Sequence, residues 1–169
     1  NVVAGDFGGI KATTVGNGNV TIFTTGNITD QPFSGGTPFG IYAENNGLTG
    51  NVVVGTFDNG SPTHIGNISG LYDGTAGIHA ATTATNNTTG TISVYNEADI
   101  TAFAPDPGIV NYGIYAVSAC DNHVTCGNVT VTNYGNIDPP TFGIFASGGG
   151  NVTVNNNADV PGGTGVQAS

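Results

Sequence analysis

The sequence predicts an all-β protein built from a repeated unit of three short strands. Three observations support this fold class: the composition, a four-residue motif that occurs six times, and a fixed spacing between the apolar segments that follow it. Glycine, threonine and asparagine dominate the 169 residues, while methionine and tryptophan are absent. Glycine and asparagine tolerate tight turns, threonine and valine favour strands, and few strong helix formers remain.

The charge balance excludes several classes of partner. The chain carries 11 carboxylates against one lysine (Lys11) and no arginine, which gives a formal net charge of -10. Nucleic-acid binding needs clustered basic residues, as does attraction to anionic membranes. No apolar run approaches the roughly 20 residues of a membrane span. We therefore expect no nucleic-acid partner and no membrane insertion by this segment.

The first strand of each unit is predicted by the motif Gly-(Ile/Val)-X-Ala. In the first five copies 30 to 37 residues separate one motif from the next, and the sixth copy follows after 22. Apolar residues at alternate positions are typical of a strand with one buried face. The six copies are Gly9–Ala12, Gly40–Ala43, Gly77–Ala80, Gly113–Ala116, Gly143–Ala146 and Gly165–Ala168.

Two further strands follow each of the first five motifs. The second segments are Val20–Phe23, Val52–Gly55, Ile92–Tyr95, Val129–Thr132 and Val152–Asn155. The third segments are centred on Ile28, Ile68, Ile100, Ile137 and Val160. The second and third segments begin eight positions apart in four repeats and sixteen in the other, and all eight prolines lie between segments. A period of 20–50 residues with three strands in each unit indicates a parallel β-solenoid.

Equivalent side chains of a parallel solenoid stack in columns about 4.8 Å apart. Alternation places the Ile, Val and Ala columns inside. A corner column before the third segment comprises Asn27, Asn67, Asp99, Asn136 and Asp159, residue types that accept turn conformations.

Outside, the X position of the motif gives a column of Lys11, Tyr42, His79, Tyr115, Phe145 and Gln167. Its four consecutive rings, from Tyr42 to Phe145, form a candidate binding ladder for sugars or a protein partner. Two alternatives stay open: the rings stabilise neighbouring repeats by stacking, or loops cover them.

The repeats, written "GIYA" and "GNVTVTNYGNI", resemble the passenger segments of bacterial autotransporters and related large surface adhesins over essentially the whole chain. The resemblance implies a right-handed single-stranded parallel β-helix (β-solenoid) of about five three-strand coils with variable corner loops. It implies that residues 1–169 form a single β-helix segment, part of a longer repeat array or a stacked assembly. It also implies an extracellular location on a bacterial cell surface.

The residue pattern offers little catalytic chemistry, so we expect no catalytic residues, no metal and no cofactor. A hydrolase needs two carboxylates about 5–9.5 Å apart, whereas Asp99 and Asp159 share a column two repeats apart. His64 and His123 lie in loops without a serine motif. A polysaccharide lyase or hydrolase remains a less favoured alternative. Ice binding by the column Thr21, Ser93, Thr130 and Thr153 is disfavoured because only Thr130 and Thr132 form a Thr-X-Thr pair.

Cys120 and Cys126 lie six positions apart in "CDNHVTC". A structural zinc site needs four ligands, and His123 is the one histidine nearby. The sequence therefore predicts a small disulfide-closed loop in an oxidising compartment.

Two non-enzymatic functions follow from these features. The first is a structural or adhesive rod, the passenger or stalk of a surface adhesin, that contacts other protein chains or cell-surface glycans. The alternative is a subunit of an extracellular filament that self-associates head to tail. Two features suggest it: the first residues, "NVVAG", resemble a second segment, and the last motif ends at Ala168.

Overall fold

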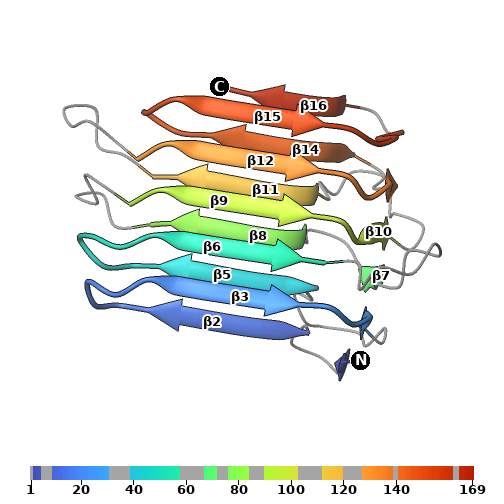
Figure 1. Ribbon diagram of the computed structural model, residues 1–169, viewed down its shortest axis with the longest axis horizontal. Helices are drawn as coiled ribbons and strands as arrows, with labels where there is room; N and C mark the ends of the chain where they lie inside the picture. Colours follow the sequence, from blue (N-terminus) through green and yellow to red (C-terminus); the bar gives the residue numbers. More distant parts are fainter. Residues whose placement is uncertain are drawn as a thin grey trace.

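The computed structural model describes residues 2–4, 9–30, 39–57, 67–71, 76–83, 90–102, 112–119, 127–138, 141–161 and 164–169. Within these ranges the regular structure consists of strands, and every strand pair is parallel. The prediction of an all-β chain with parallel stacking is confirmed. Figure 1 shows the strands stacked in sequence order, from β2 to β16.

The strands form three sheets. From β1 to β15, successive strands along the chain enter these sheets in a fixed rotation, and β16 then joins the sheet of β14 directly after β15. The first-segment sheet contains β2 (Ile10–Thr14), β5 (Ile41–Asn45), β8 (Ala76–Thr82), β11 (Tyr112–Ser118), β14 (Phe142–Ser147) and β16 (Thr164–Ala168). The second-segment sheet contains β3 (Val20–Thr24), β6 (Val52–Thr56), β9 (Ile92–Asn96), β12 (Val129–Asn133) and β15 (Val152–Asn156).

The third-segment sheet contains β1 (Val2–Ala4), β4 (Ile28–Asp30), β7 (Asn67–Leu71), β10 (Asp99–Ala102) and β13 (Ile137–Asp138). The strand β1 corrects one expectation, because Val2 pairs with Ile28 and so belongs to a third segment rather than a second. The pattern "NVVAG" has too few residues to distinguish the two by alternation.

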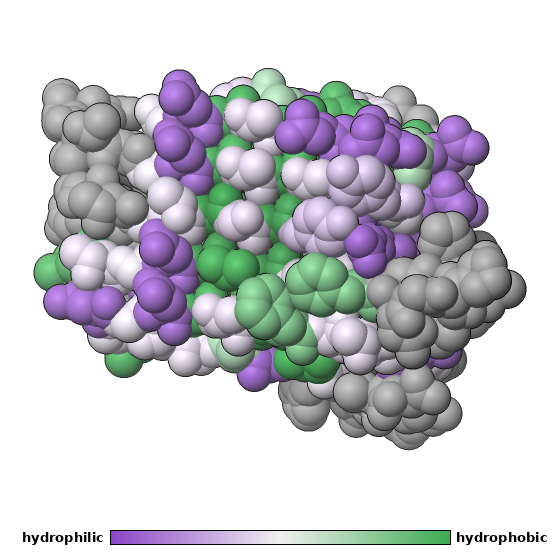
Figure 2. All heavy atoms as spheres, in the orientation of Figure 1, coloured by the Kyte–Doolittle hydropathy of each residue, from purple (hydrophilic) through white to green (hydrophobic). Residues whose placement is uncertain are grey.

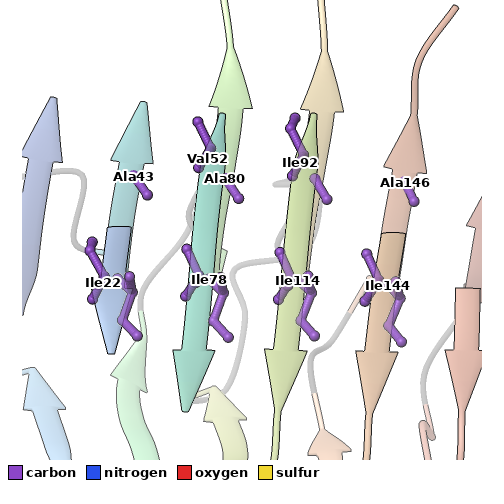
Figure 3. Packing of buried hydrophobic residues seen from close by; sticks show 14 of the residues in the cluster. Ile22, Ala43, Val52, Ile78, Ala80, Ile92, Ile114, Ile144 and Ala146 are labelled. Carbon is purple, nitrogen blue, oxygen red and sulfur yellow. The ribbon is translucent and has the colours of Figure 1, made fainter. Parts of the chain in front are cut away.

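The core lies between the sheets, where the predicted columns meet. Ile41, Ile78, Ile114 and Ile144 have no exposed surface and occupy equivalent positions on neighbouring strands. Valines and isoleucines of the second and third segments complete one continuous apolar cluster. Figure 3 shows these side chains repeating from one strand to the next. Burial of apolar surface is the main stabilising contribution to such a core.

The recurring glycine of the motif has a packing cause, which Gly113 illustrates. A Cβ atom added to Gly113 would lie 2.1 Å from Cγ2 of Ile137 and 2.6 Å from the carbonyl oxygen of Gly143. The side chain of the third-segment isoleucine therefore occupies the space that a side chain at the glycine position would need. The same conflict with a third-segment side chain recurs at Gly9, Gly77 and Gly143.

Candidate functional site

The four rings of the candidate binding ladder lie on consecutive strands of the first-segment sheet. Tyr42 pairs with His79, His79 with Tyr115, and Tyr115 with Phe145. The ring centroids are 4.4, 5.1 and 5.5 Å apart, and the planes differ by 5°, 16° and 10°. The predicted ladder is therefore present as a continuous stack.

Both flanking members of the predicted column are also in register. Lys11 pairs with Tyr42, and its Nζ lies 5.1 Å from the centroid of the Tyr42 ring, which is a cation–π distance. Gln167 pairs with Phe145 at the other end. The outward column thus runs from β2 to β16.

The stacking determines what the ladder offers to a ligand. Because the planes are nearly parallel, the face of each inner ring lies against its neighbours, and only 18% of the His79 side chain is exposed. A sugar stacks on an open ring face, and the inner rings of this ladder present their edges instead. The geometry therefore favours stabilisation of neighbouring repeats, which leaves ligand binding by the ladder a prediction.

A second row of aromatic rings, which our sequence interpretation did not include, lies beside the ladder. Phe39 packs edge-on against Tyr42 at 4.8 Å and against His79 at 5.5 Å. Tyr112 and Phe142 stack on each other at 5.3 Å, and Tyr112 packs edge-on against Tyr115 at 5.0 Å. The sequence contains a signal for this second row, since an aromatic residue directly precedes the Gly-Ile of the motif in three of its six copies.

Three polar groups interact within the ladder. The hydroxyl group of Tyr42 donates a hydrogen bond to the Glu44 carboxylate, and burial together with this bond raises the pKa of Tyr42 to about 12. Nε2 of His79 lies 3.8 Å from Oε2 of Glu44, and burial lowers the pKa of His79 from its ordinary value of 6.5. His79 is therefore mainly neutral at pH 7. Within the described part of the chain, its buried Nε2 has no hydrogen-bond partner.

The predicted corner column lies in register where the structure describes it. Asn67 pairs with Asp99, and Oδ1 of Asp99 accepts a hydrogen bond of 2.8 Å from the backbone N–H of Asn136. The backbone N–H of Ile137 donates to the carbonyl oxygen of Asp159 at 3.0 Å. Asn27 lies directly before β4, which begins at Ile28. The column joins successive repeats, as turn-forming residues of a solenoid would.

A buried amide ladder is the main polar feature that our sequence interpretation missed. Nδ2 of Asn96 donates to Oδ1 of Asn133 at 2.7 Å, and Nδ2 of Asn133 donates to Oδ1 of Asn156 at 2.8 Å. Thr56 extends the chain of bonds by donating to Oδ1 of Asn96 at 2.7 Å. Asn96 and Asn133 have no exposed surface. Alternation continued by one step beyond the second segment would have placed these asparagines inside.

The described residues contain no group of three or more His, Cys, Asp or Glu side chains placed to hold a metal ion. Nor do they form any helix of the length and apolar character that crossing a membrane would require. Asp99 and Asp159 belong to the corner column described above.

Several predicted features lie outside the described residues. These are the proposed disulfide partners Cys120 and Cys126, and the loop histidines His64 and His123. The disulfide therefore stays a prediction.

Comparison of the chain with protein-family models, with curated protein sequences and with solved structures found no match. The assignment of a function consequently depends on the residues and their arrangement.

Proposed function

We propose that this chain is a non-enzymatic extracellular rod, the passenger or stalk of a bacterial surface adhesin. Its fold would be a right-handed single-stranded parallel β-helix of about five three-strand coils. The observation that carries the proposal is the use of in-register side chains for packing. The apolar columns, the stacked rings and the buried amides all connect one repeat to the next.

Such a construction suits a mechanical role. Each repeat contacts mainly its neighbours, so length is added without a change in cross-section. The single lysine and the absence of arginine leave trypsin-like proteases one site, which would favour persistence outside the cell. A disulfide between Cys120 and Cys126, which stays a prediction, would require an oxidising compartment.

The test combines electron microscopy of the purified chain with an activity screen. We expect discrete short rods at all protein concentrations and no shortening of polysaccharides, with or without calcium. Depolymerisation of any polysaccharide would contradict the non-enzymatic assignment. Micrometre-long fibres would contradict the stalk and support the head-to-tail filament subunit instead.

A further inference from the structure

The outer face of the second-segment sheet carries a second set of rings, which we call the aromatic strip. It comprises Phe23, Phe57, Tyr95 and Tyr134, one from each of four consecutive repeats. Phe23 and Tyr95 lie within β3 and β9, whereas Phe57 and Tyr134 directly follow β6 and β12. The rings therefore alternate between two neighbouring columns.

The offset between the two columns opens the rings to solvent. Neighbouring centroids are 5.7, 5.5 and 5.6 Å apart, with planes tilted by 54°, 27° and 51°. Phe23 is 63% exposed, Tyr134 47% and Phe57 36%. In contrast to the nearly parallel rings of the first-segment sheet, these rings leave part of their faces uncovered.

Gly55 makes the arrangement possible. Phe23 pairs with Gly55, and Gly55 pairs with Tyr95, so a side chain at position 55 would stand between two members of the strip. A Cβ atom there would lie 2.6 Å from Cε2 of Phe57 and 2.7 Å from Cδ1 of Phe23. The rings of Phe23 and Phe57 close over the space that the glycine leaves.

A column of small polar side chains runs alongside the strip on the same face. Thr21, Ser93, Thr130 and Thr153 occupy equivalent positions, with Val53 in the second repeat. Figure 2 views this outer face, where pale and green residues occupy the centre between purple hydrophilic residues. The face thus combines apolar rings with hydroxyl groups that donate and accept hydrogen bonds.

The charges on this face restrict the ligand. The one lysine of the chain, Lys11, lies on the first-segment sheet, so neither lysine nor arginine is available to the strip. Tyr95 donates a hydrogen bond of 2.6 Å to Oε1 of Glu97, and this bond raises the pKa of Tyr95 to about 12. Glu97 supplies a negative charge that would repel an anionic ligand at close range.

We propose that the aromatic strip binds a neutral polysaccharide that lies along the rod axis. Pyranose rings present a face of C–H groups that packs on an aromatic ring, and their hydroxyl groups hydrogen-bond to threonine, serine and carboxylate side chains. One ring in each repeat gives a spacing close to the advance of an extended β-linked glycan per sugar. This inference deepens the adhesive part of the proposed function and rests on it.

The test measures retardation of the full chain in native gels that contain xyloglucan, glucomannan or the anionic polygalacturonate. We expect retardation by at least one of the two neutral glycans and none by polygalacturonate. The double variant Phe23→Ala/Tyr134→Ala should bind at least tenfold more weakly. A control variant, Val15→Ser/Leu48→Ser, removes apolar side chains that are 84% and 56% exposed outside the strip. It should bind like the parent, and circular dichroism should show all variants folded.

Three results of the gel measurement would overturn the proposal: no retardation by either neutral glycan, equal retardation by polygalacturonate, or equal binding by the double variant. A concentration-dependent dimer that the double variant loses would also overturn it, by assigning the strip to self-association. Discrete rods that bind no glycan would leave the structural role intact, whereas cleavage of the glycan would contradict the proposed function itself.

Discussion

Asn133 contributes three hydrogen bonds from a position without exposed surface. Its Nδ2 donates to the carbonyl oxygen of Gly135 and to Oδ1 of Asn156, each at 2.8 Å, and its Oδ1 accepts from Asn96 at 2.7 Å. The hydrogen bond to the carbonyl oxygen of Gly135 fixes the turn after β12, and the two bonds to other asparagine side chains connect three repeats. One residue therefore couples the local chain path to the stacking.

Asn133→Ala should lower the free energy of unfolding by about 2–4 kcal/mol, because buried hydrogen-bonding groups lose their partners. Asn128→Ala is the matched control: Asn128 is exposed, and its Oδ1 accepts a hydrogen bond of 3.0 Å from the backbone N–H of Asn151. We expect a loss below about 1 kcal/mol there. Urea denaturation followed by circular dichroism measures both, and similar losses would show that burial of the ladder has little effect.

A second residue-scale prediction concerns the glycine of the motif. Gly113→Ala should lower the free energy of unfolding by about 2 kcal/mol or more, because the new methyl group meets Ile137 and a backbone carbonyl. Gly18→Ala should change stability by less than about 1 kcal/mol, since no atom lies within 4 Å of a Cβ there. Thermal unfolding compares the two variants. Equal midpoints would mean that the third-segment isoleucine moves aside without cost.

At the scale of the element, the ladder on β5, β8, β11 and β14 makes stability depend on pH. Burial lowers the pKa of His79 below its ordinary value of 6.5, so the unfolded chain binds this proton more readily than the folded one. Stability contributed by neutral His79 is present above pH 6.5 and decreases as the pH falls through the interval below it.

His79→Phe should remove this component while keeping a ring in the stack. The difference in unfolding free energy between the variant and the parent should increase from pH 7.5 to pH 5 in favour of the variant. Taking the difference cancels the titration of the carboxylates common to both chains. A difference that is constant with pH would show that His79 titrates alike in both states.

Most strands and inward columns could be predicted from the sequence because alternation assigns a direction to each residue within a strand. The ladder from Tyr42 to Phe145 followed from the same rule. The Asn96 and Asn133 ladder was missed because its members are polar, although they continue the inward positions. Phe57 and Tyr134 follow the ends of strands, where alternation no longer determines direction, so their place in the aromatic strip required the structure.

At the scale of the whole molecule, charge repulsion acts on the folded chain. With a net charge of -10 and one lysine, the carboxylates have almost no cationic partners, and folding brings them closer together. Raising NaCl from 0.05 to 0.5 M shortens the Debye length from about 14 Å to about 4 Å. Stability should therefore rise by an amount on the order of 1 kcal/mol.

Urea midpoints in the two salt concentrations measure this effect. Sodium perchlorate at equal ionic strength is the comparison, because a screening effect depends mainly on ionic strength and a salting-out effect depends on the identity of the anion. A decrease in stability with NaCl would indicate that attractive ion pairs outweigh the repulsion.

The buried amide ladder also has a consequence for how such a chain changes its length. Asn96 and Asn133 each donate toward the next repeat and accept from the previous one, so both present the same donor and acceptor to their neighbours. Duplication or deletion of the segment between two of these asparagines leaves each amide donor and acceptor with a matching partner. Unequal recombination within the gene would therefore lengthen or shorten the stack of strands by one repeat while keeping these side-chain hydrogen bonds paired.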